Sequence, residues 1–152
     1  MTKQIGIMLS NLGSSQLAFY AIQHANKLAA ENKADVALFY DTLVKPIIRP
    51  QTSIMNCVEV YDFPGLKIAT QLHHASCLIN VIFPGTIVYY VWDLEWLRGN
   101  TDYMRNMNIL RNERLKLVAR SESHAKNIEN YCNKSVVAIV EDVNLEQFLT
   151  LE

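Results

Sequence analysis

One stretch decides the fold: Gly85-Thr-Ile-Val-Tyr-Tyr-Val-Trp-Asp93. Its residues from Thr86 to Trp92 are β-branched or aromatic, carry no charge and show no alternation of polar and apolar side chains. A strand that is apolar on both faces is typical of the interior of a parallel sheet, because helices cover both faces of such a sheet. We therefore expect residues 86–92 to form the central strand. Asp93 then lies at its carboxyl end, where open α/β sheets bind their ligands.

Strand and helix patterns alternate on both sides of this stretch. Short apolar runs predict strands over residues 4–9, 34–40, 66–70, 86–92, 115–119 and 135–140. Apolar residues at helical spacing predict helices over residues 15–32, 72–82, 101–112, 121–132 and 145–151. Pro46 and Pro50 predict a loop over residues 41–50. Residues 53–61 are ambiguous, and Ile54, Val58 and Tyr61 favour a short helix over a strand.

This alternation predicts an α/β fold: a three-layer αβα, Rossmann-like domain with a mostly parallel sheet of about six strands. The chain has 152 residues, which is the length of one domain, and no linker divides residues 1–152. Half of the residues are apolar and the net charge is −1. Because no strong positive field is present, nucleic-acid binding is not expected.

The cysteines and the amino terminus indicate the compartment. An odd number of cysteines without a Cys-x-x-Cys motif predicts reduced thiols and a cytoplasmic protein; they are Cys57, Cys77 and Cys132. No signal peptide is visible before the first strand. The uncharged segment 75–92 has the length of a membrane span, but Asn80 and Pro84-Gly85 interrupt it. We therefore expect a helix, a turn and a strand there, and no contact with a membrane.

The loop between the first strand and the first helix is a candidate ligand site. Small polar residues there can direct backbone N–H groups and a helix N-terminus at an anion; they are Asn11, Gly13, Ser14 and Ser15. One glycine makes neither a G-x-G-x-x-G fingerprint nor a P-loop. An ordinary tight turn explains the loop equally well, and no cofactor is expected.

Other candidate binding residues follow the strands at their carboxyl ends. Thr70 and His73 follow one strand, and Asp93 and Glu95 follow the central one. His73 or Asp93 is a candidate general base, and an exposed histidine and a capping aspartate are the alternatives. Adjacent histidines on a helix diverge by about 100°, so His73 and His74 do not form a chelating pair. No H-x-x-x-H motif occurs, and we predict no metal.

The strand over residues 115–119 is followed by Ser121-Glu-Ser-His124. Ser121 and His124 are candidate ligand contacts, and a helix cap explains them equally well. No serine has a G-x-S-x-G context, so a hydrolase triad is not expected. The basic residues between Arg98 and Lys126 alternate with acidic ones, which is typical of a solvated face with ion pairs.

Four segments, mostly in the second half of the chain, share a family pattern: Leu66-Lys-Ile-Ala-Thr70, Thr86-Ile-Val-Tyr-Tyr-Val-Trp-Asp-Leu-Glu-Trp96, Leu117-Val-Ala-Arg-Ser-Glu-Ser-His124 and Ala138-Ile-Val-Glu-Asp-Val-Asn-Leu-Glu-Gln-Phe148. Together they resemble the amino-terminal domain of GT-B glycosyltransferases. The resemblance implies acceptor-side loops at these strands and a second Rossmann domain that holds a nucleotide-sugar donor. The sequence departs from the family in three ways. It stops at Glu152, where the second domain would begin; Trp92 replaces a frequent histidine; and the first loop has a single glycine.

The resemblance and its departures together imply a non-catalytic binding, assembly or structural component. Its expected partners are a second copy of the chain or another protein, and its expected ligand is a sugar or a nucleotide. One alternative is the acceptor-binding subunit of a split glycosyltransferase, with Asp93 or His73 as the base and residues 11–15 as a polar cradle. The other is a flavodoxin-like nucleotide-binding module with residues 10–15 as its phosphate loop.

Overall fold

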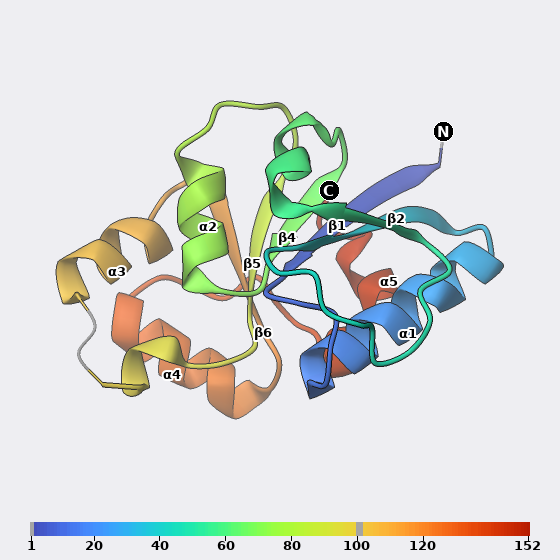
Figure 1. Ribbon diagram of the computed structural model, residues 1–152. Helices are drawn as coiled ribbons and strands as arrows, with labels where there is room; N and C mark the ends of the chain where they lie inside the picture. Colours follow the sequence, from blue (N-terminus) through green and yellow to red (C-terminus); the bar gives the residue numbers. More distant parts are fainter. Residues whose placement is uncertain (1, 100–101) are drawn as a thin grey trace.

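The sheet is the organising feature of the structure. Within residues 2–99 and 102–152, which the computed structural model describes, seven parallel strands form one sheet in the order β3-β2-β1-β4-β5-β6-β7 (Figure 1). This is the Rossmann order 3-2-1-4-5-6 with one further strand. The predicted α/β class and the predicted Rossmann-like architecture are therefore confirmed. The described sheet is entirely parallel and has seven strands instead of about six.

The strands are β1 (Lys3–Leu9), β2 (Ala34–Tyr40), β3 (Ser53–Asn56), β4 (Leu66–Ala69), β5 (Ile87–Val91), β6 (Leu115–Ala119) and β7 (Ala138–Ile139). All five residues of β5 are buried, as its unbroken apolar run predicts. The middle position of the sheet nevertheless belongs to β4. The prediction that residues 86–92 form the central strand was wrong in this respect, because the additional strand β3 extends the opposite side of the sheet.

Residues 53–61 contain both an edge strand and a helical turn. Residues 53–56 pair with β2 in the register Ala37↔Ser53 to Tyr40↔Asn56, and the 3-10 helix η1 (Cys57–Asp62) follows. The preference for a helix over the whole segment was wrong because an edge strand faces solvent on much of its surface and lacks a clear apolar pattern. The other edge strand is β7. A strand was expected over residues 135–140, and only Ala138 and Ile139 form it.

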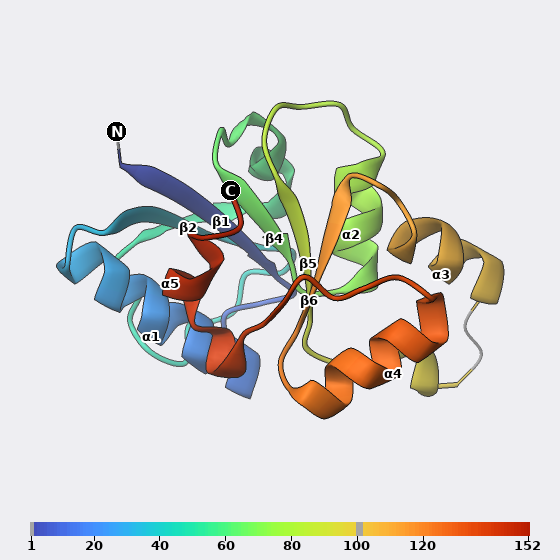
Figure 2. The ribbon, with the colours of Figure 1, turned by 180° about the vertical axis from the view of Figure 1, so that it is seen from behind.

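Helices cover both faces of the sheet. One face carries α1 (Gln16–Ala30) and α5 (Leu145–Phe148), which lie side by side when seen from behind (Figure 2). The other face carries α2 (Leu72–Ile79), α3 (Tyr103–Leu110), α4 (Glu122–Cys132) and η1. Two apolar cores result, one on each side of the sheet. Two short 3-10 helices, η2 (Glu95–Leu97) and η3 (Glu141–Val143), follow β5 and β7.

The inward face of α3 differs from the one that the sequence predicts, which consists of Tyr103, Met104, Met107 and Leu110. Met107 and Leu110 are buried as predicted, but Tyr103 and Met104 are 53% and 66% exposed. Asp102 caps the described helix by accepting a hydrogen bond from the N–H of Arg105, so Tyr103 and Met104 lie in its first, solvent-facing turn. Residue 101, with which the predicted helix begins, lies outside the described residues.

The suspected membrane segment is part of the sheet and its cover. Residues 75–92 contribute to α2 and to β5, as the interruptions at Asn80 and Pro84-Gly85 predict. In the described part of the chain, no helix combines the length and the apolar character that are needed to cross a membrane.

Candidate functional site

The strand order changes direction between β1 and β4, and this switch point is where ligands bind in open α/β sheets. Two hydrogen bonds tie the ends of these strands together. The Thr70 hydroxyl donates to the Met8 carbonyl at 2.6 Å, and Gln71 Nε2 donates to Ser10 Oγ at 3.1 Å. The Thr70 side chain is 4% exposed, so it fastens β4 to β1 from inside.

The predicted ligand loop after β1 is a tight, capped turn. Asn11 Oδ1 accepts from the Gly13 N–H at 2.9 Å, and Ser15 Oγ accepts from the Ala18 N–H at 3.0 Å and so caps α1. A Cβ atom on Gly13 would lie 2.9 Å from Val44 Cγ1, which explains the glycine. Ser14 is exposed. That this loop binds an anion or another ligand stays a prediction. The Gly13 and Ala18 N–H groups already donate hydrogen bonds within the loop.

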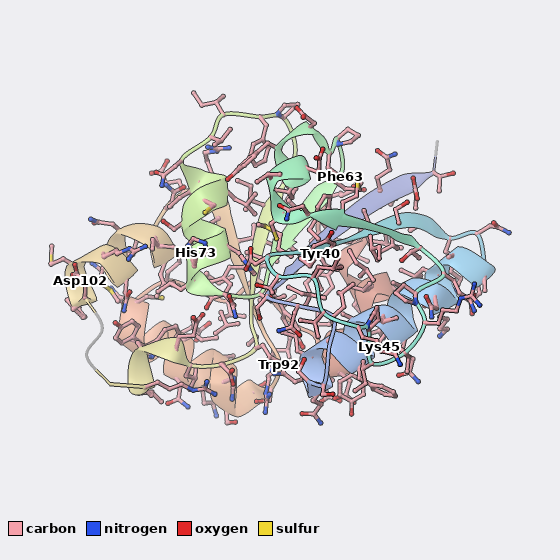
Figure 3. The ribbon with its side chains drawn as sticks, in the orientation of Figure 1. Tyr40, Lys45, Phe63, His73, Trp92 and Asp102 are labelled. Carbon is pink, nitrogen blue, oxygen red and sulfur yellow. The ribbon has the colours of Figure 1, made fainter. Side chains whose placement is uncertain are left out.

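Beside this loop, the carboxyl ends of β5 and β6 open into a pocket of about 300 Å³ that we call the Trp92 pocket. It is lined by Gln16, Trp92, Arg120, Ser121, Glu141 and Asp142. Figure 3 shows Trp92 near the beginning of α1, and its ring lies 6.4 Å from that of Tyr20. The Arg120 guanidinium lies 4.5 Å from the centre of the Trp92 ring.

A strained turn forms one wall of the Trp92 pocket. Asp142 and Val143 have φ angles of 48° and 56°, and such a conformation of a β-branched residue costs roughly 1–3 kcal/mol. The buried Tyr90 stabilises this turn through two hydrogen bonds. Its hydroxyl donates to the Val140 carbonyl at 2.6 Å and accepts from the Val143 N–H at 3.4 Å. Glu141 and Asp142, which lie between these two backbone contacts, line the pocket.

Of the two candidate ligand contacts Ser121 and His124, Ser121 is the one that lines the Trp92 pocket. Its Oγ also caps α4 by accepting from the His124 N–H at 3.2 Å. Both interpretations of Ser121 are therefore compatible with its position. Burial and the nearby Arg120 lower the pKa of His124. His124 Nδ1 is buried and has no hydrogen-bond partner among the described residues.

The acidic residues after β5 are engaged in other contacts. Glu95 Oε2 accepts from the Leu72 N–H and from the Tyr89 hydroxyl, both at 2.7 Å. Glu95 and His73 line a separate cavity of about 330 Å³ beside α3. Asp93 forms an exposed ion pair with Arg98 at 3.1 Å. The two candidate bases, His73 and Asp93, are therefore not brought together in one pocket.

Sequence reasoning missed a cluster on the other side of the switch point. Asp41 follows β2, Cys57 follows β3 and His74 lies in α2, and their donor atoms all lie within 4.8 Å of one another. His74 Nε2 and Asp41 Oδ2 are 2.7 Å apart. The signal for this cluster was the position of polar residues just after neighbouring strands. It could not be used because residues 53–56 were not expected to be a strand.

Burial dominates the electrostatics of this cluster. The His74 side chain is 1% exposed, and burial lowers its pKa although the Asp41 carboxylate opposes the shift. Burial also raises the pKa of the Cys57 thiol, and its hydrogen bond to Asp41 adds to the effect. The adjacent cavity of about 150 Å³ is also lined by Met8, Val58, Tyr61, His73 and Cys77.

Comparison with protein-family models, with curated proteins and with solved structures found no match. The resemblance to GT-B glycosyltransferases stays an expectation.

Proposed function

We propose that this chain is a GT-B-like, sugar-binding domain that works as a non-catalytic component. A single, hydroxylated ring binds in the Trp92 pocket at the carboxyl edge of the sheet. The observation that carries this proposal is the composition of that pocket, in which an indole ring, two carboxylates and a guanidinium line one hollow of about 300 Å³.

These groups suit a sugar ring. Glu141 and Asp142 supply carboxylate oxygens that accept hydrogen bonds from hydroxyl groups, and Arg120 supplies several donors. The indole of Trp92 supplies apolar surface with a polar N–H. Two carboxylates beside one guanidinium repel a phosphate, so a neutral sugar fits this pocket better than a nucleotide does.

The non-catalytic role rests on the state of the candidate bases. Asp93 is paired with Arg98, and Glu95 is bonded to Leu72 and Tyr89. His73 lines a different cavity. The volume of the Trp92 pocket lies at the lower end for ligand pockets and suits one ring instead of a sugar with its nucleotide.

The proposal includes assembly in the cytoplasm with a second copy of the chain or with another protein. Large apolar side chains are exposed near α3, where Leu97 and Met104 are 70% and 66% accessible. Light scattering at several concentrations measures self-association directly.

The test is a titration of the pure protein with a panel of monosaccharides, followed by Trp fluorescence and by ligand-observed NMR. Asp142→Asn keeps a residue type that tolerates the left-handed conformation and removes one charge. We expect it to weaken binding about tenfold, the equivalent of one charge-assisted hydrogen bond. Asp93→Asn is the matched control outside the pocket and should bind normally.

Three results would contradict the proposal. The first is equal binding by the Asp142→Asn and Asp93→Asn variants. The second is that the unmodified protein binds no sugar of the panel. The third is steady sugar transfer when the pure protein is incubated with nucleotide sugars and simple acceptors, because the proposed role is non-catalytic.

A further inference from the structure

We propose that Asp41, Cys57 and His74 form a zinc site. They provide a carboxylate, a thiol and an imidazole, which are the three kinds of side chain that bind Zn²⁺ in proteins. The site is separate from the Trp92 pocket, since none of its residues lines that pocket. The inference is thus independent of the sugar-binding proposal.

The donor atoms lie near the spacing of a zinc site. With Zn–S bonds of about 2.3 Å and Zn–N and Zn–O bonds of about 2.0–2.2 Å, two donors of a tetrahedral ion lie about 3.3–3.8 Å apart. The three donor atoms here all lie within 4.8 Å of one another. Asp41 is exposed and Cys57 is half-buried, so their side chains have room to rotate towards a common ion.

The fold explains why these residues meet. Asp41 and Cys57 follow the neighbouring parallel strands β2 and β3, and His74 lies in the first turn of α2, which follows β4. The carboxyl ends of these strands share one edge of the sheet, so residues far apart in sequence converge. The prediction of no metal considered ligands within a single segment, and this set comes from three.

An aspartate–histidine hydrogen bond alone is common in protein structures, and two further observations point to a metal. His74 Nδ1 is buried and has no hydrogen-bond partner in the described part of the chain, so its lone pair is available to a metal ion while Nε2–H donates to Asp41. A second thiol, Cys77, lies three residues further along α2 and lines the same cavity. A water molecule can complete a tetrahedron around the ion.

The donor set selects the metal. Ca²⁺ and Mg²⁺ prefer oxygen ligands, whereas a mixed sulfur, nitrogen and oxygen set suits Zn²⁺. On binding, Cys57 loses its thiol proton to solvent and bonds as a thiolate. His74 stays neutral, with its remaining proton on the ring nitrogen that does not bind the ion. The ion then joins the residue after β2, the beginning of η1 and α2.

The test uses the untagged, metal-free full chain. Competition with a chromophoric zinc chelator should give one zinc ion per chain, and Zn²⁺ should raise the melting temperature. Co²⁺ in place of Zn²⁺ should show a thiolate-to-metal charge-transfer band and the visible bands of a tetrahedral site. Cys57→Ser should remove the charge-transfer band or reduce it, and should weaken zinc binding at least about tenfold.

Asp41→Asn and Asp93→Asn form a matched pair, since each removes one carboxylate charge just after a strand. We expect Asp41→Asn to weaken zinc binding at least about tenfold and Asp93→Asn to leave it unchanged. Circular dichroism of each variant establishes that it is folded. A chain that binds no zinc at micromolar concentration overturns the proposal. Equal zinc affinity in the unmodified, Cys57→Ser and Asp41→Asn proteins does so as well.

Discussion

At the scale of single residues, the hydroxyl of Tyr90 joins strand β5 to the backbone of the η3 turn. It donates to the Val140 carbonyl and accepts from the Val143 N–H, and the side chain is fully buried. Tyr90→Phe leaves both backbone groups without this partner. We expect the free energy of unfolding to fall by about 1–3 kcal/mol, as measured by urea denaturation.

Tyr103→Phe is the control for this prediction, because Tyr103 is 53% exposed. It should change the free energy of unfolding by less than about 0.5 kcal/mol. If Tyr90→Phe were as stable as Tyr103→Phe, the hydroxyl of Tyr90 would not hold the η3 turn, and the wall of the Trp92 pocket would need another explanation.

At the scale of elements, the beginning of α2 depends on a residue from another segment. The helix starts after Gln71, whose side chain makes no capping hydrogen bond to it in the described structure. Glu95, in η2, accepts from the Leu72 N–H and from the Tyr89 hydroxyl. This one carboxylate therefore caps α2 and also joins it to β5.

Glu95→Ala should reduce the free energy of unfolding by about 2 kcal/mol, because it removes a helix cap and leaves a largely buried hydroxyl without its acceptor. Hydrogen exchange should show faster opening of the first turn of α2. The control is Asp93→Ala, which removes an exposed ion pair with Arg98 that is worth about 0–1 kcal/mol. Equal losses in the two variants would contradict the capping role.

The elements also show what the sequence could and could not predict. Buried elements such as β5 and α1 carry their own pattern, because the same faces that pack in the core are apolar in the sequence. The edge strand β3 does not, because its formation depends on pairing with β2. Tyr103 and Met104 were misplaced because apolar side chains at helical spacing need not face the core.

The same reasoning applies to the candidate site. The alternation of strands and helices predicted that the site lies at the carboxyl edge of the sheet, and Ser121 does line a pocket there. The contact of Arg120 with Trp92 and the cluster of Asp41 with His74 join segments that are far apart in sequence. Such contacts depend on side-chain directions and on loop paths, which one sequence does not specify.

At the scale of the whole molecule, two buried tyrosines in the interior strand β5 contribute to the response to alkaline pH. Burial raises the pKa of Tyr90 from 10.0 to about 12. Burial and the neighbouring Glu95 raise the pKa of Tyr89 well above its usual value. The folded protein therefore keeps both protons at a pH where the unfolded chain has lost them, so this contribution to stability is complete below pH 10 and is lost as the pH rises towards 12.

We expect a spectrophotometric titration to show tyrosinate from Tyr89 and Tyr90 only as the protein unfolds. Burial lowers the pKa of Lys67 from its usual 10.5. This lysine therefore makes the free energy of unfolding rise with pH, whereas the two tyrosines make it fall. A variant is needed to separate the contribution of the tyrosines. Tyr90→Phe should lose stability less steeply between pH 10 and 12 than the unmodified protein, and Tyr103→Phe should follow the unmodified curve. Ionisation of all seven tyrosines near pH 10, while circular dichroism still reports a folded protein, would contradict the buried, hydrogen-bonded environment of β5.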